Sequence, residues 1–325
     1  MQRRHFCALA GASLMPAFGA RAAGAAYPQR PVRIICPYAA GGGPDVQLRQ
    51  LAPSLGEVLG QPIVIENKVG AGGVLAAQYV ATQPADGYTL LQGSSTHLVQ
   101  KLMTPGLKFD PLKDFAFATN ISTSPTVLVV TADSPYKSAE DLIAAAKAAP
   151  GKFNYSSGGI GSAAHLAGAT FAALSKLTVV HVPLKGSVEI MSSLLRGDTQ
   201  FAFPTAGTGV PQVQGGKLRA LAVTSPKRLP QLPDVPTLEE VLKSKLAVQE
   251  SWSGLWAPAG VPPDVLTRLN AAVNKVLAMP AIRKQIQESG GEPALSASPK
   301  AFADFVRAEN AKWAEVIRLT GVTAT

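Results

Sequence analysis

Short apolar runs alternate with helical patterns along most of the chain. The runs at 32–36, 63–66 and 88–91 are bounded by Pro, Gly or Asn, which is typical of buried strands. Between the first two runs, leucines recur at helical spacing, at Leu48, Leu51, Leu55 and Leu59. Strands that alternate with helices through short loops predict an α/β fold built on parallel, doubly wound sheets.

The same alternation returns in the middle of the chain. Strands are predicted at 127–130, 153–156, 179–182 and 218–223, with helices at 139–149, 162–174 and 188–195. The C-terminal part is predicted to be helical at about 263–277, 281–289 and 299–319. Two sets of strands therefore predict two lobes, each with its own core.

The stretches around Ser124–Thr126 and Gln249–Trp256 are predicted to cross between the lobes. The first lobe is then discontinuous, made of residues 27–125 and 252–325, and the second lobe spans 126–251. This organisation predicts a hinge with a cleft between the lobes.

Residues 1–26 have the layout of an export signal peptide. A basic start with Arg3 and Arg4 precedes an apolar core from Cys7 to Phe18 and a zone rich in Ala and Gly. The core of about a dozen residues is too short for a bilayer, which needs about 20. The paired arginines fit a twin-arginine signal, and Sec export fits as well. We expect a mature chain in the periplasm that does not insert into a membrane.

Composition narrows the classes of function. The formal net charge is +9, and Arg3, Arg4 and Arg21 lie in the signal, so 9 − 3 leaves +6 on the remainder. The other Lys and Arg residues are scattered, which argues against nucleic-acid binding.

Cys7 and Cys36 are the two cysteines, so the mature chain keeps one thiol, and Cys36 is predicted to be buried in its apolar run. No cofactor or metal is expected, because neither HExxH nor CxxC spacing occurs.

Two similar junctions carry the strongest functional signal. Each is a strand, a Gly-rich turn and a helix start, at Ala39–Asp45 in the first lobe and Ser156–Ala163 in the second. The first-turn N–H groups of a helix are unpaired, and the helix dipole favours an anion there. Two such junctions on facing lobes predict a carboxylate site that needs no Lys or Arg. Asp45 is expected to support its helix start, and His165 to be a neutral structural histidine.

Three enzyme classes are the alternatives to this binding site. No GxSxG elbow occurs, which argues against an α/β-hydrolase. Gly159–Ala164 fits a loose dinucleotide pattern, but the next strand leads to no acidic residue for a ribose. A periplasmic hydrolase using Ser94 or Ser95 with His97 stays as an alternative.

With these motifs in view, the sequence resembles the Bug-type receptors, the substrate-binding proteins of tripartite tricarboxylate transporters. The similarity covers essentially the whole mature chain. The motifs that carry it include Ala39-Ala40-Gly41-Gly42-Gly43-x-Asp45, Glu66-Asn67-Lys68-x-Gly70-Ala71-Gly72-Gly73, Asp86-Gly87-Tyr88-Thr89, Gly159-x-Gly161-Ser162-x-x-His165 and Trp252-x-Gly254-Leu255.

The resemblance implies a type II periplasmic binding protein fold, with two lobes joined by a hinge. By position it implies ligand contacts from four segments, namely Tyr38, Ala40, Gly41, Gly42, Gly43 and Asp45; Ser94, Ser95 and Thr96; Ser157, Gly159, Ile160, Gly161, Ser162, Ala163 and His165; and Thr205 and Ala206. The chain departs from the family pattern at Pro44, where Thr or Ser is common, and at Ala169, where an acidic residue is usual.

The sequence therefore predicts a periplasmic receptor and not an enzyme. It is expected to capture a small organic acid, aliphatic or aromatic, and deliver it to membrane permease subunits. The alternative is a ligand-sensing receptor that acts with a two-component sensor kinase.

Overall fold

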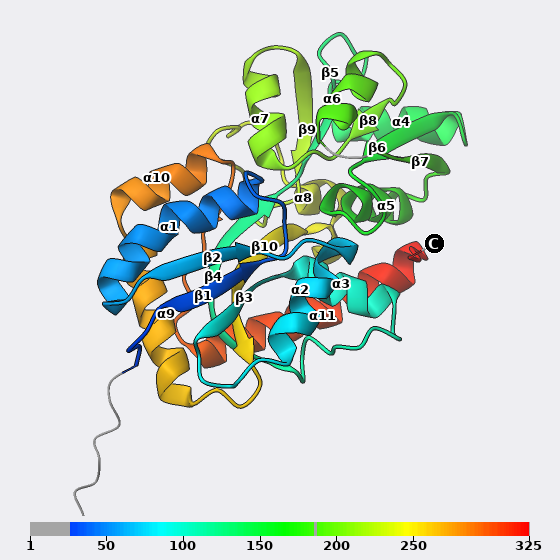
Figure 1. Ribbon diagram of the computed structural model, residues 1–325. Coiled ribbons are helices and arrows are strands. Elements are labelled where there is room, and N and C mark those ends of the chain that lie inside the picture. The colour runs from blue at the N-terminus through cyan, green and yellow to red at the C-terminus, as the bar shows by residue number, and fades with distance from the viewer. Residues whose placement is uncertain (1–26, 185–186, 325) are drawn as a thin grey trace, which may run out of the picture.

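The computed structural model describes residues 27–184 and 187–324, and these form two sheets with helices on both faces of each (Figure 1). The predicted signal peptide at 1–26 lies outside the described residues. No helix in the described ranges has the length and apolar character needed to span a bilayer.

The first lobe is built on a six-stranded sheet with the order β11-β4-β10-β3-β1-β2. The parallel strands β1 (Val32–Cys36), β2 (Ile63–Asn67) and β3 (Thr89–Ser94) confirm the predicted runs. Next to them, β10 (Glu250–Pro258) runs antiparallel between β3 and β4 (Phe115–Pro125), and β11 (Glu292–Pro293) lies at the edge. The sheet is therefore mixed and not wholly parallel, because β10 enters it from the second lobe.

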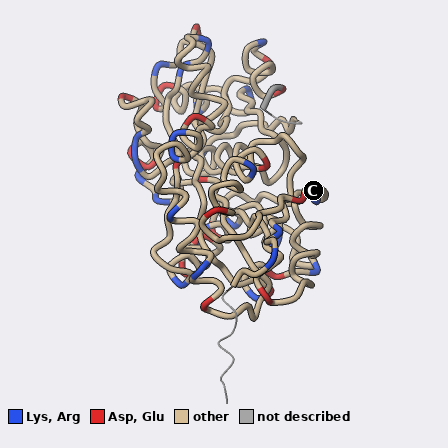
Figure 2. Tube along the Cα trace, turned by 60° about the vertical axis from the view of Figure 1, so that its left-hand side comes forward, with Lys and Arg blue, Asp and Glu red and all other residues tan. Residues whose placement is uncertain are grey.

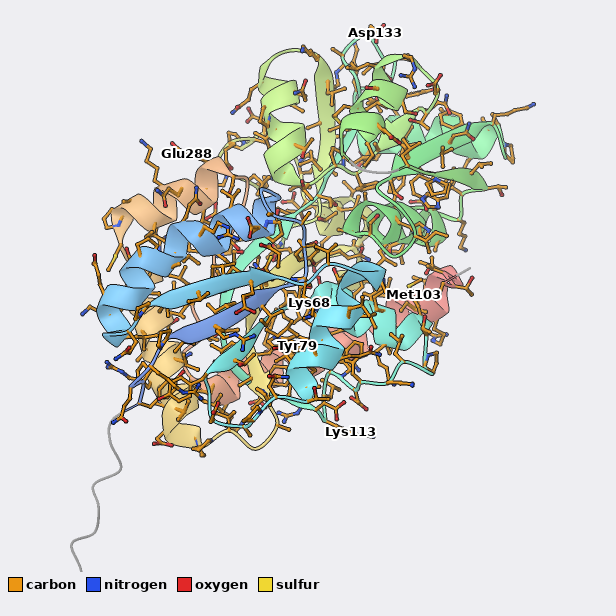
Figure 3. All side chains as sticks on the ribbon, in the orientation of Figure 1. Lys68, Tyr79, Met103, Lys113, Asp133 and Glu288 are labelled. Carbon is orange, nitrogen blue, oxygen red and sulfur yellow. The ribbon has the colours of Figure 1, made fainter. Side chains whose placement is uncertain are left out.

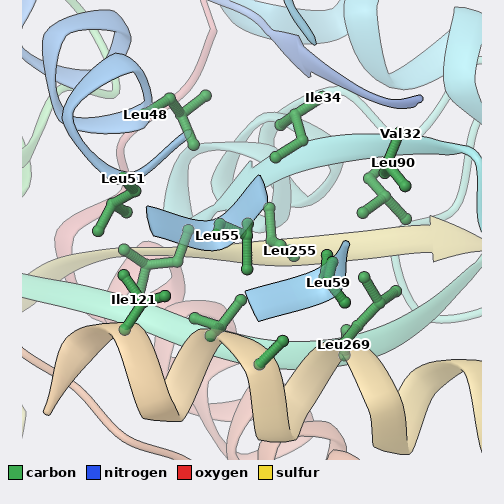
Figure 4. Packing of buried hydrophobic residues seen from close by; sticks show 14 of the residues in the cluster. Val32, Ile34, Leu48, Leu51, Leu55, Leu59, Leu90, Ile121, Leu255 and Leu269 are labelled. Atoms are coloured by element: carbon green, nitrogen blue, oxygen red, sulfur yellow. The ribbon is translucent and has the colours of Figure 1, made fainter. Parts of the chain in front are cut away.

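Helices cover both faces of this sheet. One face carries α1 (Gly43–Leu59), α9 (Pro263–Leu277) and α10 (Pro280–Glu288), and the other carries α2 (Val74–Ala81), α3 (Ser95–Met103) and α11 (Pro299–Thr320). The four leucines of α1 are all buried in the core shown in Figure 4, where they meet Ile34, Leu255 and Leu269. Their helical spacing places them on the one face that turns toward the sheet.

The second lobe is built on a five-stranded sheet with the order β7-β6-β8-β5-β9. It contains β5 (Val127–Thr131), β6 (Phe153–Ser157), β7 (Val179–Pro183), β8 (Phe201–Ala202) and β9 (Leu218–Val223). On one face lie α4 (Ala139–Ala148), α5 (Ala163–Ser175) and α8 (Leu238–Leu242), and on the other lie α6 (Ser187–Leu195) and α7 (Ala206–Gln214).

The chain passes between the two sheets twice. β4 continues through Thr126 into β5, and Gln249 leads back into β10. Thr224 ties the two passages together, because its N–H donates to the Thr126 carbonyl oxygen at 3.0 Å and its own carbonyl oxygen accepts the Gln249 N–H at 2.9 Å. These adjoining strands form the connection between the lobes.

Strand directions bring the loop-bearing edges of both sheets to this connection. β4 runs parallel to β3, since both are antiparallel to β10, so the carboxyl ends of β1, β3 and β4 share one edge. In the other sheet, β8 ends beside the start of β5, and β6 runs parallel to β8. The loops that follow β1, β3, β6 and β8 therefore all lie on the sides where the lobes meet.

Candidate functional site

The first Gly-rich loop joins β1 to α1 in a tight turn. Gly41 adopts a φ of +79°, which a residue with a Cβ adopts only with strain. The Gly42 N–H donates to the Ala39 carbonyl oxygen at 3.1 Å, and Gly42 caps α1 in an extended conformation. Ala40, Gly41 and Gly43 are exposed, so the turn presents main chain to solvent.

The Asp45 carboxylate holds this turn in place. Its carboxylate is 1% exposed, accepts the Gly41 N–H at 2.8 Å and the Asn67 amide at 2.7 Å, and forms an ion pair with Arg49 at 3.0 Å. The hydrogen bond from Arg49, with those from Gly41 and Asn67, lowers the pKa of Asp45 to about 2 although burial opposes this. Asp45 therefore shapes the loop as a buried carboxylate in the first turn of α1, where it accepts the Gly41 N–H and does not cap the helix.

The second Gly-rich loop joins β6 to α5 with the same turn. Gly161 has a φ of +74°, the Ser162 N–H donates to the Gly159 carbonyl oxygen at 3.2 Å, and Ser162 caps α5. The Gly161 N–H donates to Nδ1 of His165 at 3.0 Å. His165 thus occupies the place that Asp45 has in the first loop, four residues after the left-handed glycine.

The His165 ring is held neutral beneath its loop. It stacks on His181 with ring centroids 3.9 Å apart, and His181 Nε2 lies 2.7 Å from the Ser157 hydroxyl. Burial, with the neighbouring His181, lowers the pKa of His165 to about 4. Since Nδ1 accepts the Gly161 N–H, the neutral ring carries its proton on Nε2. This confirms the expected structural histidine.

The shared turn decides which N–H groups remain open. The N–H groups of Gly41 and Gly161, which precede the helices, are bonded to the side chains of Asp45 and His165. In the described chain, no internal acceptor is found for the first-turn N–H groups of Gly43 and Asp45, or of Ala163 and Ala164. Each helix therefore offers two open donors in its first turn, at the first and third positions in α1 and at the first and second in α5, because Pro44 has no N–H and the His165 N–H donates to the Ser162 hydroxyl.

The loop after β3 lies against the first Gly-rich loop. The Ser94 hydroxyl is 3.3 Å from the Tyr38 hydroxyl, and Ser94 caps α3, with Ser95 buried and Thr96 half-buried. The Ser94 N–H donates to Nδ1 of His97 at 3.1 Å, which completes a capping box. Burial lowers the pKa of His97 to about 4.

The remaining predicted segment, Thr205 and Ala206, lies beside the passage between the lobes. Thr205 caps α7 and pairs with Thr126, and Ala206 is buried. In the second loop, Ile160 is exposed, and a Cβ on Gly161 would meet Met103 Sδ of the first lobe at 3.3 Å. Figure 3 labels Met103 where α3 approaches α5.

A polar cluster at the start of the passage between the lobes was not predicted from the sequence. Gln47 of α1 donates to the Ser122 hydroxyl at 3.0 Å, and the Ser122 and Ser253 hydroxyls are 3.3 Å apart. These residues come from α1, β4 and β10. The alternation of strands and helices along the sequence gives no sign that these three residues meet. The long strand β4 would have pointed to them, but it was not predicted from the sequence.

The open donors at the two helix starts are main-chain N–H groups and not basic side chains. None of the four predicted segments contains Lys or Arg, and Figure 2 shows basic residues scattered over the molecule. Within residues 27–184 and 187–324, no group of three or more His, Cys, Asp or Glu side chains is placed to hold a metal ion. The geometry offers neutral donors at two helix starts, an arrangement suited to an anion.

Comparison with known proteins identifies the family. A family model for the tripartite tricarboxylate transporter family receptor, TctC, matches residues 47–322. The chain belongs to the TctC receptor family.

Individual TctC receptors are similar along most of their length. Protein BugT of Bordetella pertussis is 34% identical over 297 residues, covering 91% of this chain and 90% of that protein. The structure of R. palustris Rpa4515 with adipate is 33% identical, with a TM-score of 0.78, and covers 92% of this chain and 99% of that chain. MatC from Rhodopseudomonas palustris with bound malate is 29% identical, with a TM-score of 0.74 and coverage of 90% and 100%. The Bug-type resemblance and the two-lobed fold are confirmed.

Membership in the TctC family also decides the enzyme question. The family consists of receptors, so the hydrolase alternative is wrong. Ser94 and His97 lie together because they form the capping box of α3, and His97 is 1% exposed. A buried histidine that already accepts a main-chain N–H is poorly placed to serve as a general base.

Proposed function

We propose that this protein is a periplasmic receptor that binds a small organic carboxylate between its lobes and delivers it to a membrane permease. The TctC family match supports the transport role. The solved relatives with adipate and with malate support a carboxylate as the ligand. Export through residues 1–26 and the permease subunits are parts of this proposal.

The observation that carries the proposal is the pair of equivalent turns at Ala39–Asp45 and Gly159–His165. Each presents two open N–H groups at a helix start, and the two helices belong to different lobes. A hydrogen bond to a charged group contributes about 1.5–3 kcal/mol, and the dipole of each helix adds to the attraction. The four open N–H groups of the two turns together contribute about 6–12 kcal/mol, from which the cost of association is subtracted, and no cationic side chain is involved.

The lobe assignment follows from the same geometry. We propose 27–125 with 252–325 as one lobe and 126–251 as the other, with the hinge at the two passages tied by Thr224. A carboxylate that contacts both turns binds better when the lobes are close together. It therefore shifts the population toward that arrangement by its difference in affinity.

The test is isothermal titration calorimetry of the purified protein from residue 27 onward. The panel includes malate, adipate, a tricarboxylate and an aromatic acid, with the diamide of adipic acid as the neutral control. At least one acid is expected to bind with a Kd below about 1 mM, or −4 kcal/mol, and the diamide is expected not to bind. Absence of binding by every acid, or equal binding of the diamide, contradicts the proposal.

Delivery and location need separate measurements. Cell fractionation is expected to find the chain in the periplasmic fraction, shortened by about 26 residues. Deletion of the gene is expected to abolish uptake of the radiolabelled acid that calorimetry identifies. Retention of the full-length chain in the cytoplasm contradicts the location, and unchanged uptake contradicts the delivery role.

A further inference from the structure

Two glycines on opposite lobes lie in direct main-chain contact beside the hinge. Gly207 is in the first turn of α7 in the second lobe, and Gly290 follows α10 in the first lobe. A Cβ on Gly290 would overlap the nitrogen and Cα of Gly207, and a Cβ on Gly207 would overlap the Ser289 carbonyl oxygen and lie 3.0 Å from its carbon. Neither position has room for any side chain.

Both glycines are anchored to the strands that pass between the lobes. The Gly290 carbonyl oxygen accepts a hydrogen bond from the Ser124 hydroxyl at 3.2 Å, one residue before the end of β4. Gly207 lies two residues after Thr205, which pairs with Thr126. The contact therefore lies close to the hinge, where a rotation of the lobes displaces atoms least.

Beyond the glycines the two lobes diverge. A cavity of about 370 Å³ opens next to them, lined by α7 from the second lobe and by the end of α10 from the first. Glu288, labelled in Figure 3, lies on its first-lobe wall. On this side the backbone contact is therefore bordered by open space, while on the other side the lobes meet where α5 packs against α11.

We infer that the Gly207–Gly290 contact is a fulcrum that sets how closely the lobes approach each other. A methyl group at either position needs ~3.5–4.0 Å to its neighbours, so the backbones must separate by on the order of 1 Å. Because the contact is near the hinge, a small wedge there changes the angle between the lobes. This inference deepens the proposed function, since closing the lobes is how the two turns reach one ligand.

Two matched pairs of variants separate this role from local strain. Gly207 lies inside a helix, where alanine is ordinarily favourable. The control for Gly207→Ala is Gly209→Ala in the same helix, because a Cβ on Gly209 would meet Pro204 and Val127 beside α7. Gly290→Ala adds the strain of a φ of +78°, and Gly60→Ala, at +80° with nothing within 4 Å, is its control.

The measurement is the distance between spin labels on the two lobes, without ligand. Labels are placed at Lys275→Cys on α9 and Lys147→Cys on α4, both exposed, in the protein from residue 27 onward. Cys36 is fully buried and stays unlabelled. Gly207→Ala and Gly290→Ala are each expected to move the mean distance by about 1 Å or more, in the same direction, and the controls are expected to match wild type.

An unchanged distance in Gly207→Ala overturns the inference, because α7 then adjusts within its own lobe. Equal shifts in contact and control variants overturn it as well. Should one contact variant fail to fold, its partner on the other lobe gives the same test. The distances are measured without any acid. The result therefore does not depend on whether the protein binds a carboxylate, and a failure of the proposed function can be told apart from a failure of this inference.

Discussion

Pro44 is one of two positions where the two similar turns differ in donors. At the third helical position the Asp45 N–H has no acceptor in the described chain, whereas the His165 N–H donates to the Ser162 hydroxyl at 3.3 Å. Pro44 occupies the second position of α1, where Ala164 stands in α5, and a proline has no N–H to offer. Pro44→Ala restores that donor at the helix start. The Pro44 carbonyl oxygen accepts the Gln92 amide at 3.3 Å, a contact that involves main chain and survives the substitution.

The magnitude follows from one added hydrogen bond to a charged group. Such a bond contributes about 1.5–3 kcal/mol, so Kd for the carboxylate is expected to fall about tenfold to hundredfold. The folded protein is expected to lose about 0.4–1 kcal/mol of stability, because alanine gives the unfolded chain more freedom than proline. Affinity and stability thus move in opposite directions.

Calorimetry on the acid found in the panel, with thermal unfolding of the free protein, measures both effects. Pro53→Ala is the matched control, since Pro53 lies in the same helix but away from its N-terminus. It is expected to leave Kd unchanged. If Pro44→Ala folds and binds with the wild-type Kd, the first-turn N–H groups of α1 do not contact the ligand and the paired-turn argument is refuted.

Two further predictions concern the support beneath the turns. Asp45→Ala leaves the Gly41 N–H without an acceptor, removes one of the two acceptors of the Asn67 amide and breaks the ion pair with Arg49. Urea unfolding is therefore expected to show a loss of about 3 kcal/mol, and a loss below about 1 kcal/mol contradicts the role assigned to Asp45. His97 and His165 have a pKa of about 4 in the folded state against 6.5 unfolded, so the unfolded chain binds more protons between these values. Stability is therefore expected to be full above pH 6.5 and to fall as the pH is lowered to 4, and a flat urea midpoint across this window contradicts the assignment.

Local patterns were sufficient for the elements that hold the site. Leucine spacing predicts α1, and Pro and Gly punctuation predicts the strands before both turns, because helix and strand periods are properties of neighbouring residues. The helix at 263–277 has the predicted bounds. Pattern analysis did not resolve β4, α3 or α7, whose polar and small residues resemble loop sequence.

The sequence by itself determined the fold class, the family and the presence of a glycine turn before each of two helices. It did not determine which N–H groups stay open. Asp45 and His165 take up the glycine donors from four residues away, an arrangement visible only once the turn is folded. The meeting of Gln47 with Ser122, and of Gly207 with Gly290, joins segments 75 and 83 residues apart. Such contacts depend on strand order and lobe placement, which are properties of the whole chain and not of any local run of residues.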